Sequence, residues 1–93
     1  MTQTERIQYM ERILDEAAEA ARSLSLALER YLAMKDSMAE LEAYYTGPQW
    51  MRDYEDDCAG KLPERLKRGV LSEDAVYDLL STREALRKMS REL

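Results

Sequence analysis

The feature that most constrains the fold is residues 4–45, a stretch that contains neither glycine nor proline. Its apolar residues recur at alternating steps of three and four, which is the spacing of a helix that packs on another helix. The first part of this stripe consists of Ile7, Met10, Leu14, Ala17, Ala21, Leu24 and Leu28. The spacing therefore predicts one long amphipathic helix over about residues 4–45.

The stripe shifts by one residue near its middle. The step from Leu24 to Ala27 is three residues where four are due, and such a stammer overwinds a coiled coil or marks a bend. Serines at 23 and 25 favour a bend there, because their hydroxyls can bond to preceding carbonyls. We expect the helix to continue through this point, and any bend to fall at residues 23–25. Beyond it the stripe continues as Ala27, Tyr31, Met34, Met38, Leu41 and Tyr45.

All the glycines and prolines of the chain lie between Gly47 and Gly69, which confines the loops to that span. Pro48 suits the first position of a second helix, and Gly60 suits a left-handed helix end. Short helices are predicted over about 48–57 and 63–68. Ser72 is the predicted N-cap of a last helix over about 73–91. With no Phe and few β-branched residues, the chain is predicted to be a single all-α domain, 1–93, whose last helix folds back as a helical hairpin or small bundle.

The predicted helices differ greatly in length. A helix over 4–45 would be about 60 Å long, whereas the last helix would be about 30 Å long. Part of the long stripe is therefore left without a cover from its own chain, and uncovered apolar surface usually marks an interface. We expect a homo-oligomer, such as a coiled-coil homodimer, or a partner helix on this surface. The expected interface residues are Ile7, Met10, Leu14, Ala17 and Ala21.

Charge and cysteine content limit the classes of partner. The chain has 19 acidic and 14 basic residues, a net charge of −5, which disfavours binding to nucleic acid. A lone Cys58 excludes an intrachain disulfide and fits a reducing compartment. No apolar run has the length of a membrane span or the form of a signal peptide. The sequence predicts a cytoplasmic protein with neither nucleic acid nor membrane as a partner.

Candidate chemistry is restricted to carboxylates. The chain has no histidine, which removes the commonest general base, and a lone cysteine cannot form a structural zinc site. Carboxylates on one helical face could bind Mg²⁺ through oxygen, as in the all-helical nucleotide pyrophosphohydrolases. The candidates for such a metal site are Asp53, Asp56, Asp57, Glu16 and Glu19.

The alternative interpretation of the acidic cluster is a solvated face without catalytic residues or cofactor. Four cations follow it closely in the chain and can offset its charge. They are Lys61, Arg65, Lys67 and Arg68. A further alternative, an acidic regulatory protein that mimics nucleic acid, requires the acidic residues to share one continuous surface.

Aromatic residues gather on both sides of the turn at residues 46–48. Tyrosine and tryptophan suit half-buried positions where the ring is covered and the polar end stays bonded. We expect this set to pack the end of the long helix against the segment that follows. It consists of Tyr44, Tyr45, Trp50 and Tyr54.

From Trp50 onward the chain resembles a family of small bacterial proteins catalogued as a domain of unknown function. The resemblance is carried by Trp50, Asp53, Tyr54, Asp57, Gly60, Leu62, Pro63, the run Leu66-Lys67-Arg68-Gly69-Val70-Leu71-Ser72-Glu73-Asp74, and Tyr77-Asp78-Leu79-Leu80. Glu5-Arg6-Ile7 and the long helix are similar to the family as well. The resemblance implies a soluble, helical, bacterial protein and no mechanism. The residues themselves favour a non-enzymatic interaction module over a Mg²⁺-dependent hydrolase.

Overall fold

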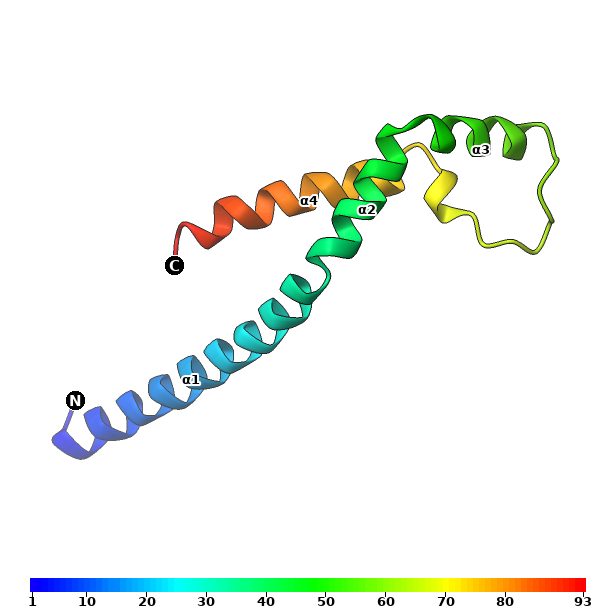
Figure 1. Cartoon of the computed structure of the whole chain (residues 1–93). Helices are drawn as coiled ribbons and strands as arrows, with labels where there is room; N and C mark the ends of the chain where they lie inside the picture. The colour runs from blue at the N-terminus through cyan, green and yellow to red at the C-terminus, as the bar shows by residue number, and fades with distance from the viewer. The chain divides into compact units, whose positions relative to one another are not determined.

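The computed structural model describes residues 1–93 and contains helices without strands (Figure 1). The elements are α1 (Gln3–Ala33), α2 (Lys35–Thr46), α3 (Pro48–Cys58), the 3₁₀ helix η1 (Gly69–Leu71) and α4 (Ala75–Ser90). The prediction of an all-α chain is confirmed. The chain divides into two units, residues 1–35 and residues 36–93, which are described in turn.

The first unit is essentially the helix α1. It begins at a capping box in which the Glu5 N–H donates to Thr2 Oγ1 at 3.2 Å and the Thr2 N–H donates to Glu5 Oε1 at 3.4 Å. The helix then runs through residues 23–25 without a break. None of its 31 residues is buried.

The predicted single helix over 4–45 is wrong at one point, because α1 ends at Ala33 and α2 begins at Lys35. Met34 between them has φ −88° and ψ 1°, and its N–H donates to the Tyr31 carbonyl at 3.0 Å, as in a tightened last turn. No glycine or proline marks this position. The two helices differ in burial, because α2 contains the buried side chain of Met38 and α1 contains no buried side chain. The interruption therefore falls where buried contacts begin.

The second helix ends where the sequence predicts. Thr46 is its last residue, Gly47 is the N-cap of α3, and Pro48 occupies the first helical position. A Cβ atom on Gly47 would lie 2.9 Å from the Ala43 carbonyl oxygen, so only glycine fits this turn without a shift. The predicted helix over 48–57 is confirmed as α3.

The predicted helix over 63–68 is wrong, because these residues form a turn and loop. The Leu66 N–H does donate to the Pro63 carbonyl at 3.1 Å, as at the start of a helix. However, the guanidinium of Arg68 binds the Pro63 carbonyl, the Leu66 carbonyl and the Asp57 carboxylate. The side chain therefore uses carbonyls that a helix would bond to backbone N–H groups, and the helical turn η1 forms only afterwards.

The last helix, α4, begins two residues later than predicted. The N-cap is Asp74 and not the predicted Ser72, although Ser72 Oγ still accepts a hydrogen bond from the Ala75 N–H at 3.2 Å and so satisfies one N–H of the first turn. Arg87 and Lys88 lie in the last turn, where cations interact favourably with the helix dipole.

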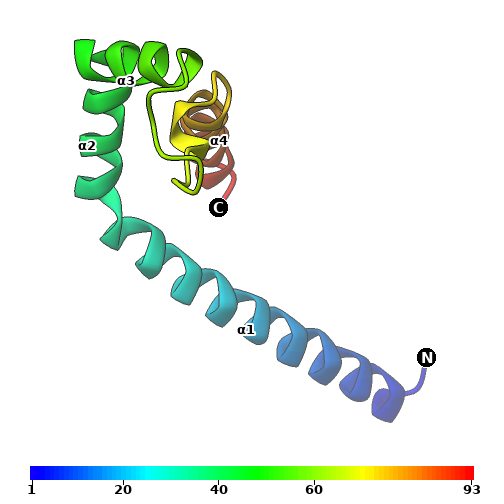
Figure 2. The same cartoon turned by 90° about the vertical axis from the view of Figure 1, so that its right-hand side faces the viewer.

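The core of residues 36–93 is small and draws one side chain from each helix. Its buried members are Met38 of α2, Trp50 of α3, Leu71 of η1 and Val76 of α4. The chain returns from α3 through the loop and η1, whose backbone packs against both α3 and α4 (Figure 2). Long side chains join α4 to α2, since Arg83 Nη1 lies 2.7 Å from Glu42 Oε2. The last helix is thus linked to α2 by this ion pair, but the backbones of α2 and α4 do not pack together as the predicted helical hairpin would require. None of the helices combines the length and apolar character needed to cross a bilayer.

The end of α3 gives a first test of backbone conformation. Gly60 has φ +71°, a value that side-chain-bearing residues rarely adopt. Gly60→Ala is expected to lower the free energy of unfolding by about 1 kcal/mol in urea denaturation. Gly69→Ala is the matched control, because a Cβ there meets nothing within 4 Å and its φ is not positive. Equal stability losses in the two variants would contradict this account.

Candidate functional site

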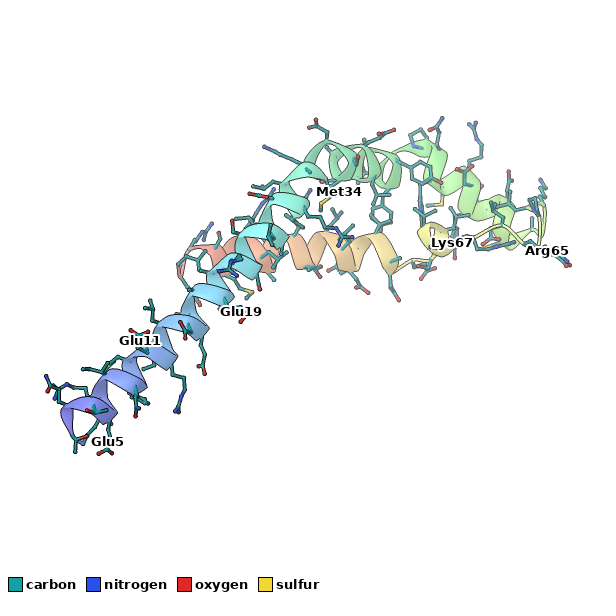
Figure 3. The ribbon with its side chains drawn as sticks, turned by 90° about the horizontal axis from the view of Figure 1, so that it is seen from below. Glu5, Glu11, Glu19, Met34, Arg65 and Lys67 are labelled. Carbon is teal, nitrogen blue, oxygen red and sulfur yellow. The ribbon has the colours of Figure 1, made fainter.

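The predicted interface residues lie exposed along α1. Ile7, Met10 and Leu14 have exposed fractions of 53%, 56% and 60%, and Ala17 and Ala21 are exposed as well. Figure 3 shows the side chains that project from this helix, with Glu5, Glu11 and Glu19 marking its length. None of the five predicted interface residues is therefore buried within its own unit.

The exposed apolar surface continues past the predicted residues. Leu24 and Leu28 extend the same heptad pattern toward the end of α1, and both are about half exposed. Since α1 is continuous through residues 23–25, the seven apolar positions from Ile7 to Leu28 fall on one helical face. We call this set the α1 face: Ile7, Met10, Leu14, Ala17, Ala21, Leu24 and Leu28.

The acidic residues of α3 are not gathered into a metal site. Asp53 accepts a hydrogen bond from the Tyr44 hydroxyl at 2.7 Å, Asp57 binds Arg68, and Asp56 lies 3.9 Å from Lys61. Each carboxylate thus has a different partner, and no three acidic or thiol side chains converge in a way that could hold a metal ion. The other two candidates, Glu16 and Glu19, are exposed on α1.

The four basic residues that follow α3 differ in their contacts. Lys61 and Arg68 pair with α3 carboxylates, which matches the solvated-face interpretation of the acidic cluster. Arg65 and Lys67 are exposed on the loop, where Figure 3 labels them. The run therefore serves in part to hold the loop on α3.

The aromatic residues around the turn form the contact that the sequence predicts. Trp50 stacks on Tyr54 with ring centroids 5.2 Å apart and meets Tyr45 edge-on at 5.2 Å. Its indole N–H donates to the Val70 carbonyl at 2.9 Å, and the Tyr54 hydroxyl donates to the Glu73 carboxylate at 2.8 Å. This cluster positions α2, α3 and η1 together.

A shallow hollow of about 350 Å³ lies beside this cluster. The Tyr44–Asp53 pair forms its polar side, and the apolar side chains of the loop and η1 form most of the rest. Sequence reasoning missed the pair, because it considered Asp53 only as a metal ligand or as part of a solvated face. The residues that line the hollow are Tyr44, Asp53, Leu62, Leu66, Lys67, Arg68, Val70 and Leu71.

Two tyrosines have raised pKa values. The hydrogen bond to Asp53, with smaller effects of desolvation and of the Asp53 charge, raises the pKa of Tyr44 to about 12. The hydrogen bond to Glu73, followed by interactions with Cys58, raises the pKa of Tyr54 to about 12. In each case a negatively charged neighbour opposes formation of the phenolate.

The raised pKa values predict a loss of stability in alkali. Tyr44 and Tyr54 hold their protons more tightly in the folded protein than in the unfolded chain. Their contribution to the free energy of unfolding is therefore complete below pH 10 and is lost as the pH rises through about 12. Tyrosinate absorbance should therefore show a late ionisation step. Asp53→Asn is expected to move the Tyr44 part of that step to lower pH, since the variant removes the charge and keeps an acceptor oxygen. An unchanged titration in Asp53→Asn would contradict the assignment.

These elements define a small all-α protein whose long amphipathic helix α1 has no buried residue. A family model described as "Domain of unknown function (DUF4298)" matches residues 7–93. The chain belongs to this family, which confirms the resemblance found in the sequence. No curated protein and no solved structure matches the chain.

Proposed function

We propose that the protein is a non-enzymatic, self-associating helical module, and that the α1 face is its association surface. One observation carries this proposal: α1 has 31 residues, none of them buried, and presents five large apolar side chains on one side. Contiguous exposed apolar surface of this kind marks an interaction site more often than a free surface. A cytoplasmic location, supported by the single free cysteine, is part of the proposal.

The energetics favour a weak, concentration-dependent assembly. The five large side chains of the α1 face are each about half exposed, so covering one contributes about 1 kcal/mol. Two copies together would gain about 10 kcal/mol, against an association cost of roughly 4–15 kcal/mol. With a cost near the lower end of that range, about 4.5 kcal/mol, the net gain is about 5.5 kcal/mol, so we expect dimers to become dominant at about 100 µM rather than at nanomolar concentration.

The hydrolase and the acidic regulator receive no comparable support. The carboxylates proposed for Mg²⁺ are bound to Tyr44, Lys61 and Arg68 instead of facing one another. Lys61 and Arg68 pair with two of the α3 carboxylates, so cations interrupt the acidic surface of this helix.

The mass in solution tests the proposal. Sedimentation equilibrium or light scattering across a concentration series should show a rise from 10.9 kDa toward twice that value. Far-ultraviolet circular dichroism at both ends of the series should show that the helices persist. A clean monomer at about 100 µM would refute self-association.

A charge placed on the α1 face should prevent the association. Leu14→Glu, at a position 60% exposed, is expected to keep the chain monomeric and helical, because the carboxylate would have to be desolvated in the dimer. Leu86→Glu is the matched control, since Leu86 is a leucine 39% exposed on α4 and does not belong to the α1 face. Both variants are compared with the parent by sedimentation equilibrium. If only Leu86→Glu made the protein monomeric, the association surface would lie on α4, and the proposal would be contradicted.

A further inference from the structure

We infer that the α1 face is covered by α1 of a second copy running antiparallel, with the two helices crossing near Glu19. This inference rests on the proposed function and specifies its partner. Its grounds are the order of large and small side chains along α1 and the uneven distribution of charge.

From Met10 to Leu28 the α1 face has the same order of side-chain size when followed from either end. Ala17 and Ala21 lie on either side of Glu19, and Leu14 and Leu24 come next at equal distances from it. Met10 and Leu28 follow, again at equal distances. An antiparallel pair centred on Glu19 therefore places Leu14 of one copy with Leu24 of the other, and alanine with alanine at the centre. Large layers meet large layers between Met10 and Leu28, as a two-fold symmetric interface requires, and Ile7 lies beyond this symmetric part.

The centre of this arrangement allows the helices to approach closely. Ala17 and Ala21 carry only a methyl group each, and the distance between packed helices depends on the side chains at the contact. Neighbouring Ala18 and Ala20 flank these positions, so no large side chain holds the backbones apart there. Bulky side chains on either side of the crossing can then interdigitate.

Charge selects the antiparallel direction over the parallel one. Residues 3–19 of α1 carry five acidic and two basic side chains, a net charge of −3, whereas residues 20–33 carry two basic and one acidic, a net charge of +1. A parallel pair would place the two acidic halves side by side. The antiparallel pair places each acidic half beside a positive half, and it also opposes the two helix dipoles.

Distances between paired spin labels test the direction of the helices. The labels are attached to Gln8→Cys and, separately, to Glu19→Cys, both in a Cys58→Ser background because the natural thiol is exposed. Gln8 and Glu19 are exposed and lie outside the α1 face, so the labels leave that face unchanged. In the antiparallel pair each Gln8 lies eleven residues from the centre, which separates the two labels by about 33 Å along the axis. We expect the Gln8 distance to exceed the Glu19 distance by more than about 10 Å.

Sedimentation of the same labelled samples separates the possible failures. A dimer in which the two label distances are equal would be parallel, and it would overturn this inference while leaving the proposed function intact. A dimer with labels too far apart to couple at either position would associate through another surface and would also overturn the inference. A monomer without dipolar coupling would refute both the inference and the proposed function.

Discussion

Trp50→Ala is expected to lower the free energy of unfolding of residues 36–93 by about 3–5 kcal/mol, the largest loss from any single truncation in the chain. Trp50 is only 8% exposed, stacks on Tyr54, meets Tyr45 and bonds to the Val70 carbonyl. Removing it deletes contacts to three segments at once. Only four residues form this core, so little remains to hold α3 against η1.

Circular dichroism during urea denaturation measures this loss of stability. Fluorescence cannot be used, because Trp50 is the only tryptophan and the variant lacks it. Trp50→Phe is the matched variant. It keeps an aromatic ring but loses the N–H donor to Val70, and it is expected to cost about 1–2 kcal/mol. If Trp50→Ala melts as the parent does, the aromatic cluster is not the centre of this unit.

Val76→Asp is expected to have a similarly large effect, with a loss of more than about 3 kcal/mol. Val76 is 3% exposed, the most buried of the four core residues, and its carboxylate replacement would have no basic partner among Met38, Trp50 and Leu71. Either the charge remains buried at a high cost or α4 separates from η1.

Tyr77→Asp provides the control for this second prediction. Tyr77 is adjacent in sequence, lies on the same helix and is 62% exposed. Its substitution by the same charged residue should change the stability by only about 0.5 kcal/mol. Thermal unfolding of both variants at one pH measures the difference, and similar melting temperatures would show that α4 contributes little to the fold.

Much of the helical organisation could be predicted from the sequence, because the relevant forces act over a few residues. Glycine at 47 and proline at 48 separate two helices, Ser72 accepts a hydrogen bond from the first turn of a third helix, and Gly60 ends α3 with a positive φ. The apolar period of α1 could be predicted for the same reason. A helix without buried residues is governed by its own sequence, so the exposed α1 face agrees with the pattern closely.

Other features depend on contacts between distant residues, which local patterns do not contain. The loop at 61–68 replaces a predicted helix because Arg68 reaches back to Asp57 and to loop carbonyls. Asp53 turns toward Tyr44 although the helical pattern places it outward. The interruption at Met34 falls beside the first buried side chain of residues 36–93, with no local residue that ends a helix.

The sequence by itself thus determined the helical class, the turn at Gly47–Pro48 and the apolar face of α1, since periodicity and backbone preference are properties of neighbouring residues. Only the tertiary structure decided where the long helix ends and which carboxylates are paired. Those outcomes follow from the positions of side chains that meet across 9 to 20 residues of sequence, and packing fixes these positions only when the chain has folded.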